Sequence, residues 1–296
     1  RTVFLISPSQ IRKLLDKHGV KLKRSLGQNF LIDGNILDNI VEGAEIEEDD
    51  NILEVGPGIG SLTRTLCRKG AKVVAVEIDR ALFPILDETL KDYENVHIIH
   101  GDILKIDLEK VVAEYFKGEP FKIVANLPYY ITSPILMAFL ESNLSYKDIT
   151  VMVQSEVADR IMATAGTKDY GLLTVAVNYY ADVFPIAKVP PSVFMPQPKV
   201  SSQVIKLVHN TRHTIEESEE KLFFEIIKAA FSKRRKTLLN ALSSYPSMKD
   251  IGDKNYIRQV LKEAKIDPTR RGETLDLEEF ISIAQILRQH LSPYDI

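Results

Sequence analysis

An apolar strand that runs directly into three closely spaced glycines constrains the fold of this chain more than any other stretch. The predicted strand begins at Asn51 and ends at Gly56, and Gly58 and Gly60 follow at alternate positions. Glycine has no Cβ, so it lets the backbone turn sharply and approach a ligand closely. Residues 61–69 are then predicted to form a helix whose N-terminus points at the same loop. The pattern predicts an α/β domain with a ligand site at this loop, and its spacing is not the G-x-G-x-x-G of dinucleotide-binding proteins.

Two further predicted strands end in acidic residues. Residues 72–76 run into Glu77, and residues 95–100 run into Asp102. In open α/β sheets, ligands bind beyond the carboxyl ends of the strands. An acid about 20 residues beyond a glycine loop is placed to accept hydrogen bonds from both hydroxyls of a ribose, so Glu77 is the candidate for that role.

A fourth predicted strand, residues 121–125, ends in a stiff turn. Asn126 follows the strand, and Pro128 then stops further strand pairing because proline has no N–H and a fixed φ. The Asn126 side-chain oxygen and the Leu127 carbonyl oxygen are suited to accept the two N–H bonds of an exocyclic amine. The ring of Tyr129 can stack on the base that carries this amine. The turn therefore predicts a site for the amino group of a nucleic-acid base.

These motifs together resemble those of a known enzyme family. Residues 126–129 resemble the Asn/Asp-Pro-Pro-Tyr-type motif of methyltransferases that modify amino groups in nucleic acid, and the glycine loop matches that of S-adenosylmethionine-dependent methyltransferases. Motifs at residues 27–31, 232–240 and 270–275 extend the likeness over nearly the whole chain. The chain thus resembles the ribosomal RNA adenine N6,N6-dimethyltransferases of the small subunit.

The resemblance implies a fold, a reaction and a set of site residues. The fold is a Rossmann-like methyltransferase domain, with a mixed seven-stranded sheet flanked by helices, and a small all-α C-terminal domain. The reaction is dimethylation of adenosine N6 in 16S-type rRNA, at two adjacent adenosines near the 3′ end, during ribosome biogenesis. The implied donor-binding residues are Gln28, Asn29, Leu31, Gly56, Gly58, Gly60, Glu77, Ile78, Asp102, Ile103 and Asn126. The implied catalytic residues are Asn126, Leu127, Pro128, Tyr129 and Phe194, the last as a second aromatic wall opposite Tyr129.

Local charge matters more for RNA binding than total charge. The net charge of −3 counts mildly against a nucleic-acid binder. Basic residues are nevertheless concentrated in clusters, which are suited to contact phosphates. The predicted RNA-binding residues are Lys21, Lys23, Arg24, Lys233, Arg234, Arg235 and Lys236.

Composition argues against several other classes of protein. The single cysteine, Cys67, cannot form an intrachain disulfide and fits a reducing cytosol. The six histidines lack metal-ligand spacing, and no apolar run approaches the ~18–20 residues of a membrane span. No signal-like segment stands at the N-terminus, although the chain begins at Arg1. We therefore expect a cytoplasmic protein without metal or membrane partners. The resemblance implies binding to the small ribosomal subunit, and we expect the protein to be a monomer.

The pattern of elements predicts two domains. Residues 1–211 are expected to form the S-adenosylmethionine-binding methyltransferase domain, with two further strands at 183–189 and 200–208. Residues 212–296 become purely helical and are expected to form the RNA- or ribosome-binding domain.

Three alternatives remain open on the sequence alone. They are a large-subunit rRNA methyltransferase of the antibiotic-resistance type, a non-catalytic ribosome assembly factor, and a mitochondrial transcription-factor relative. Tyr130 and Ser155 depart from the family pattern, at positions where Asn and Lys are typical, which leaves the details of RNA contact open.

Overall fold

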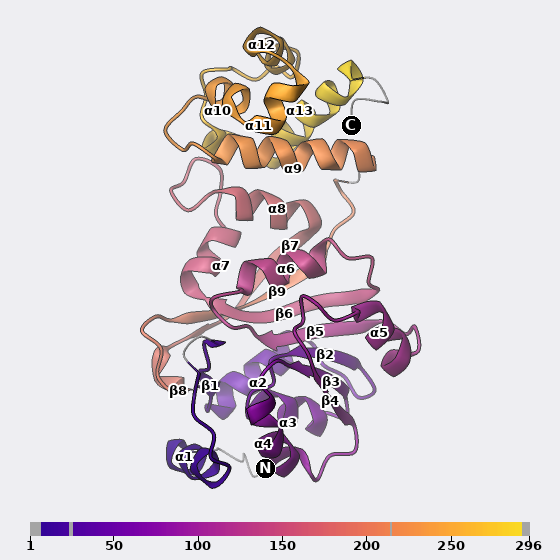
Figure 1. Ribbon diagram of the computed structural model, residues 1–296, viewed down its shortest axis with the longest axis vertical. Helices are drawn as coiled ribbons and strands as arrows, with labels where there is room; N and C mark the ends of the chain where they lie inside the picture. Colours follow the sequence, from indigo (N-terminus) through magenta and orange to yellow (C-terminus); the bar gives the residue numbers. More distant parts are fainter. Residues whose placement is uncertain (1–6, 24–25, 214, 292–296) are drawn as a thin grey trace. The chain divides into compact units, whose positions relative to one another are not determined.

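The structure is a computed structural model that describes residues 7–23, 26–213 and 215–291 (Figure 1). By contacts, the chain divides into two compact units. Unit 1 comprises residues 1–158 and 182–209, and unit 2 comprises residues 159–181 and 210–296. The division predicted from the sequence, at residue 211, instead assigns residues 159–181 to the N-terminal domain.

Unit 1 is built on a seven-stranded sheet in the order β4-β3-β2-β5-β6-β9-β7 (Figure 1). The strands β4, β3, β2, β5 and β6 are parallel, and β9 runs antiparallel to β6. Their bounds are β2 Asn51–Val55, β3 Lys72–Glu77, β4 Val96–His100, β5 Phe121–Asn126, β6 Tyr146–Gln154, β7 Ala181–Val189 and β9 Ser202–His209. The predicted mixed seven-stranded sheet is confirmed.

Helices precede or connect these strands. Their bounds are α1 Pro8–Lys17, α2 Gly34–Gly43, α3 Ser61–Arg68, α4 Phe83–Leu90, α5 Leu108–Phe116, α6 Thr132–Leu140 and α7 Ser155–Ile161, with 3₁₀ turns η2 Arg80–Leu82 and η3 Pro191–Val193. Helix α2 begins at Gly34, where the Asp33 carboxylate accepts hydrogen bonds from the backbone N–H groups of Asn35 and Ile36.

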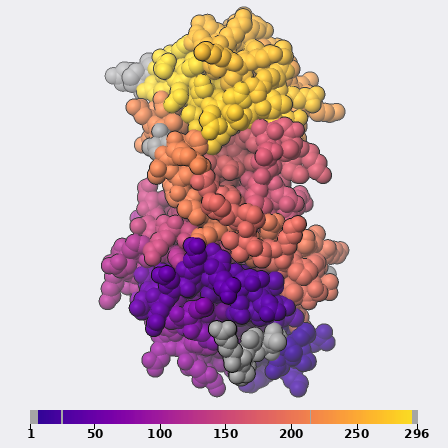
Figure 2. All heavy atoms as spheres, turned by 180° about the vertical axis from the view of Figure 1, so that it is seen from behind, coloured from indigo at the N-terminus to yellow at the C-terminus, as the bar shows by residue number. Residues whose placement is uncertain are grey.

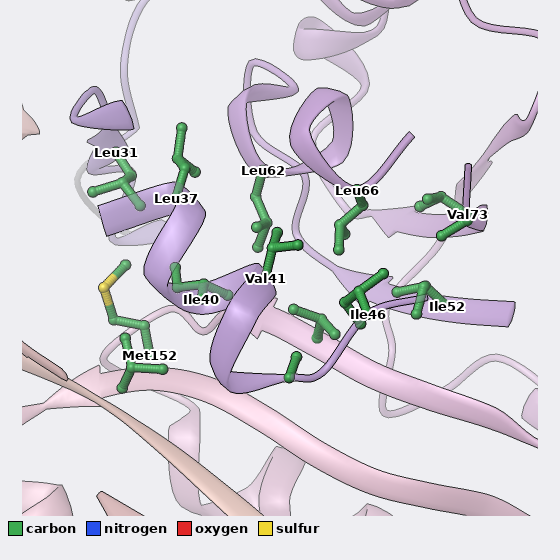
Figure 3. Close-up of a cluster of buried hydrophobic side chains, with 14 of the residues drawn as sticks. Leu31, Leu37, Ile40, Val41, Ile46, Ile52, Leu62, Leu66, Val73 and Met152 are labelled. Carbon is green, nitrogen blue, oxygen red and sulfur yellow. The ribbon is translucent and has the colours of Figure 1, made fainter. Parts of the chain in front are cut away.

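The apolar faces of α2 and α3 cover one face of the sheet. Leu37, Ile40 and Val41 of α2 and Leu62 and Leu66 of α3 share one buried cluster with strand residues (Figure 3). The strand residues Ile52, Val73 and Met152 belong to the same cluster. Burial of these apolar side chains stabilises helices that would be only marginally stable on their own. The packing fixes the end of β2 and the start of α3, and with them the glycine loop.

A two-stranded sheet that the sequence did not predict holds the N-terminal segment. Strand β1, Phe30–Leu31, pairs antiparallel with β8, Phe194–Met195. The backbone N–H of Ile32 also donates to the carbonyl oxygen of Val193, at 2.9 Å. These contacts anchor the segment before α2 against the loop of residues 190–201, which contains four prolines.

Unit 2 is helical. It contains α8 Leu172–Tyr180, α9 Glu217–Phe231, α10 Leu238–Ser244, α11 Pro246–Ile251, α12 Lys254–Glu263, η4 Gly272–Thr274 and α13 Leu277–His290. The orange and yellow atoms of α9 to α13 form one close-packed group (Figure 2). Phe223 and Phe280 lie fully buried within unit 2. None of the helices in the described residues is long and apolar enough to cross a membrane.

Candidate active site

A cavity of about 270 Å³ lies at the carboxyl ends of β2, β3 and β5. Its lining includes residues 26–31, 54–59, 76–78, 101–103 and 126–131. These ranges contain every predicted donor-binding residue except Gly60, and the whole turn from Asn126 to Tyr129. The cavity therefore brings together residues that lie up to about a hundred positions apart in the chain.

The glycines of the loop have different roles. Gly58 has a φ of 62°, and a Cβ added there would meet two ring atoms of Phe30 at 3.1 Å. Gly58 is therefore required both for the turn and for the close approach of the N-terminal segment. Gly60 has a φ of 85° and is the N-cap residue of α3. Gly60 does not line the cavity, so its part in the site is to start the helix.

Glu77 is held rigidly at the end of β3. Its Oε1 accepts a hydrogen bond from the backbone N–H of Asp79 at 2.8 Å, and its Oε2 accepts one from Gly58 at 3.3 Å. Burial raises the pKa of Glu77 above its ordinary value, although these backbone hydrogen bonds oppose the shift. Each carboxylate oxygen can accept a second hydrogen bond. The side chain is thus a fixed acceptor for a pair of hydroxyl groups.

Glu54 also lines the cavity, and the sequence analysis missed it. The residue is only 1% exposed, and its Oε2 has no hydrogen-bond partner among the described residues. Burial raises the pKa of Glu54 to about 8, and the neighbouring Glu77 carboxylate adds to the rise. A single acid inside an apolar strand, as in Leu53-Glu54-Val55, was the signal that could have identified it.

We expect Glu54 to make stability depend on pH. The folded pKa lies above the unfolded value, so the neutral carboxyl stabilises the fold fully below about pH 4.5, and this contribution is lost as the pH rises towards 8. The slope is about 1.4 kcal/mol per pH unit inside this window. Glu54→Gln removes the titrating group, so the variant should gain stability relative to the wild type from pH 5.5 to 7.5. Urea unfolding of both proteins measures the difference, and a pH-independent difference would contradict a buried neutral Glu54.

The turn after β5 is fixed by contacts on both sides. The Asn126 side-chain amide donates to the carbonyl oxygen of Asn29 at 3.4 Å, and the Tyr129 hydroxyl lies 2.6 Å from Ser202 Oγ. The Thr132 hydroxyl donates to the Pro128 carbonyl oxygen at 3.1 Å. With its amide nitrogen engaged, Asn126 keeps its side-chain oxygen as an acceptor. The arrangement is suited to bind an exocyclic amine beside an aromatic ring.

Phe194 is not among the residues that line this cavity. It is 3% exposed and belongs to the same buried cluster as Leu31, Met152 and Val204. The pairing of β8 with β1 turns the residue into the core beside Leu31, which itself lines the cavity. Phe194 therefore belongs to the core beside Leu31 and is not part of the cavity surface.

The basic residues before α2 have different surroundings. Lys21 is exposed, whereas the Lys23 ammonium forms an ion pair with Asp79 Oδ1 at 2.7 Å. Gln28 donates to Asp79 Oδ2 at 2.8 Å. Arg24 lies outside the described residues. Asp79 thus binds the segment beside the cavity, a contact that the sequence analysis missed, since nothing in the local sequence distinguishes Asp79 from a helix cap.

The second predicted basic cluster lies in the turn between α9 and α10. Lys233, Arg234, Arg235 and Lys236 are all exposed. Arg234 also contacts the Lys168 carbonyl oxygen and lies 3.9 Å from the Glu273 carboxylate. In contrast, Arg270 of the neighbouring motif is bound to Glu279. The turn therefore exposes positive charge, while Arg270 contributes to the internal packing of unit 2.

No group of three or more His, Cys, Asp or Glu side chains within the described ranges could hold a metal ion.

Comparison with known proteins gives one consistent family. Residues 19–283 match the model of the family described as ribosomal RNA adenine dimethylase. The ribosomal RNA small subunit methyltransferase A of Alkaliphilus oremlandii is 52% identical, with 96% of this chain and 98% of that protein covered. The protein of the same name from Clostridioides difficile is 50% identical, with 97% and 98% covered.

Two solved structures share the fold over most of the chain. A dimethyladenosine transferase from Plasmodium falciparum has a TM-score of 0.70 at 26% identity and covers 86% of this chain and 95% of its own. The 23S rRNA methyltransferase ErmE has a TM-score of 0.64 at 27% identity and covers 88% and 100%.

Proposed function

Since the chain belongs to the ribosomal RNA adenine dimethylase family, we propose that it dimethylates N6 of adenosines in small-subunit, 16S-type rRNA during ribosome biogenesis. The methyl donor is S-adenosylmethionine, and the targets are two adjacent adenosines near the 3′ end. The observation that carries the proposal is the position of the Asn126–Tyr129 turn, which forms part of the wall of the same cavity as the glycine loop. One cavity thus offers a nucleoside-type site and an amine acceptor side by side.

The residues of the cavity fit S-adenosylmethionine. Glu77 would accept the ribose hydroxyls, and Asp102 would accept the adenine amine, with Ile78 and Ile103 against the ring. The absence of a Cβ at Gly58 lets the Phe30 ring pack against the loop, whereas a Cβ at Gly56 would meet nothing within 4 Å. The remaining donor contacts proposed are Gln28, Asn29, Leu31, Gly56 and Asn126. When bound, the donor supplies an already activated methyl group on its sulfonium.

The chain's own residues then align and activate the amine. Asn126 and the Leu127 carbonyl accept the two N–H groups, which favours a pyramidal nitrogen with its lone pair directed at the methyl group. Pro128 fixes the turn, and Tyr129 stacks on a flipped-out base. Phe194 is retained as the proposed second wall, which requires its ring to leave the core when a base enters.

Binding of the ribosomal substrate is assigned to the basic clusters. Lys21, Lys23, Arg24 and the cluster from Lys233 to Lys236 contact phosphates, and the protein acts as a cytoplasmic monomer on the small subunit. We propose that residues 1–211 carry methyl transfer and residues 212–296 carry RNA or ribosome binding. Lys23 can take part only if its contact with Asp79 is shared or broken.

Large-subunit RNA is the less supported substrate. The relatives at 50–52% identity are named for the small subunit, whereas the large-subunit enzyme ErmE shares 27% identity. A purely non-catalytic assembly factor is also less supported, because the cavity retains Glu77 and Asp102 together with its glycines.

Methyl transfer to separated subunits tests the proposal. The protein is incubated with radiolabelled S-adenosylmethionine and either undermethylated small subunits or large-subunit RNA. We expect label in the small-subunit RNA and only background label in the large-subunit RNA. Equal labelling, or labelling of the large-subunit RNA alone, would overturn the choice of substrate.

A further inference from the structure

Asp79 is a buried carboxylate with no assigned role in the proposed reaction. Its side chain is 1% exposed, although it lies just beyond the candidate ribose ligand Glu77. It accepts hydrogen bonds from Lys23 Nζ at 2.7 Å, Gln28 Nε2 at 2.8 Å and the backbone N–H of Ala81 at 3.1 Å. Burial alone would raise the pKa of Asp79, but these bonds hold it below its ordinary value. Asp79 is therefore an ionised carboxylate whose negative charge is balanced by Lys23 and by hydrogen bonds from the N-terminal segment.

Lys23 and Gln28, which both bind Asp79, are also hydrogen-bonded to each other. The backbone N–H of Lys23 donates to Gln28 Oε1 at 2.7 Å, which closes a ring of hydrogen bonds through Asp79. Gln28 belongs to residues 26–31, which form one wall of the cavity. A Cβ added to Gly27 would lie 3.6 Å from Tyr130 and 3.7 Å from the Tyr129 backbone, so the same segment also borders the turn after β5.

The wall is thus held at two separate places. Its far end is fixed by the pairing of Phe30 and Leu31 with β8. Its near end is fixed by the charge-assisted contacts of Lys23 and Gln28 with Asp79, which are stronger than neutral hydrogen bonds. The backbone N–H of Asp79 also donates to Glu77 Oε1, so one residue links the wall to the candidate ribose ligand.

We propose that Asp79 is a positioning residue whose carboxylate holds residues 26–31 against the donor cavity and so sets how fast the methyl donor and its spent product exchange. This inference rests on the proposed function, since it takes the cavity as the donor site. A ligand behind this wall leaves faster when the wall is released at one end. Lys23 accordingly holds the wall, and it can contact a phosphate only when its ion pair with Asp79 is shared or broken.

Three variants test whether Asp79 and Lys23 hold the wall. Asp79→Asn keeps the size of the side chain and removes its charge, Lys23→Gln removes the ammonium from a half-exposed position, and the third variant combines both changes. Lys17→Gln is the matched control, because it breaks the ion pair with Glu88 on the same unit, away from the cavity wall. Amide hydrogen exchange of residues 26–31 is measured in the ligand-free protein, and dissociation of S-adenosylhomocysteine is measured by displacement.

We expect each single variant to speed up both exchange and dissociation by about tenfold, the scale of one charge-assisted contact. The double variant should be no faster than the faster single variant, because both changes remove the same contact. The control should match the wild type. Unchanged rates in Lys23→Gln, fully additive effects in the double variant, or equal acceleration by Lys17→Gln would overturn the proposal, even if Asp79→Asn fails to fold.

The hydrogen-exchange arm separates this inference from the proposed function. If the wild type does not bind S-adenosylhomocysteine, the donor assignment fails. Exchange of residues 26–31 in the ligand-free protein still reports whether Asp79 and Lys23 hold the wall.

Discussion

Asn126→Ala is expected to reduce methyl transfer by at least ~10²–10³-fold, the scale for loss of one positioned polar group in a transition state. The change removes an amine acceptor, and it also removes the contact between Asn126 and the Asn29 carbonyl oxygen, which joins the turn to the cavity wall. Donor affinity should fall much less, because Glu77 and Asp102 remain in place. Single-turnover transfer and calorimetric titration with S-adenosylmethionine separate these two quantities.

Asn35→Ala is a suitable control for this prediction. Asn35 is exposed in the first turn of α2, so the same chemical change there leaves the cavity intact. Transfer by the control should equal that of the wild type. Near-normal transfer by Asn126→Ala would remove this residue from the reaction and, with it, the role assigned to the turn.

Phe194→Ala is expected to lower the free energy of unfolding by about 3–5 kcal/mol, the usual cost of truncating a buried phenylalanine. The reason is its place in the core beside Leu31 and Met152. Phe184→Ala is the matched control, because Phe184 is 50% exposed on β7 of the same unit. This control should change stability by only about 0.5 kcal/mol. Urea unfolding of both variants measures the difference.

The proposed stacking role of Phe194 adds a second expected result. At a temperature where Phe194→Ala remains folded, monomethyladenosine should accumulate, because a monomethylated amine must be held and turned without its lost N–H. A normal dimethyl product made at the normal rate would confine Phe194 to the core. Equal losses of stability in Phe194→Ala and Phe184→Ala would contradict its burial.

The strand ends could be predicted from the sequence because each is marked locally. An apolar run followed by glycine, acid or Asn-x-Pro shows where the strand stops, and in a parallel sheet such ends meet at one edge. Glu77, Asp102 and Asn126 therefore converge on one cavity as predicted. Asp33 likewise marks the start of α2, because aspartate favours the N-cap position of a helix.

Other features depend on contacts between distant residues, which produce no recognisable pattern in the local sequence. Helix α8, with the sequence Leu-Leu-Thr-Val-Ala-Val-Asn-Tyr-Tyr, is almost entirely buried, so it shows no amphipathic period, and its β-branched residues disfavour a helix. The β1–β8 pair is only two residues long on each side. It accounts for the burial of Phe194. Asp79 acquires its role from Lys23 and Gln28, more than 50 positions away.

Nucleoside mass spectrometry of the product shows whether the turn beside the cavity presents adenosine N6 to a methyl donor. Undermethylated small subunits are treated with the wild-type protein and S-adenosylmethionine, and the RNA is then digested to nucleosides. We expect N6,N6-dimethyladenosine at two residues per subunit with the wild type, and we expect this product not to form with Asn126→Ala. Methylation of another base, or of adenosine at any atom other than N6, would contradict it.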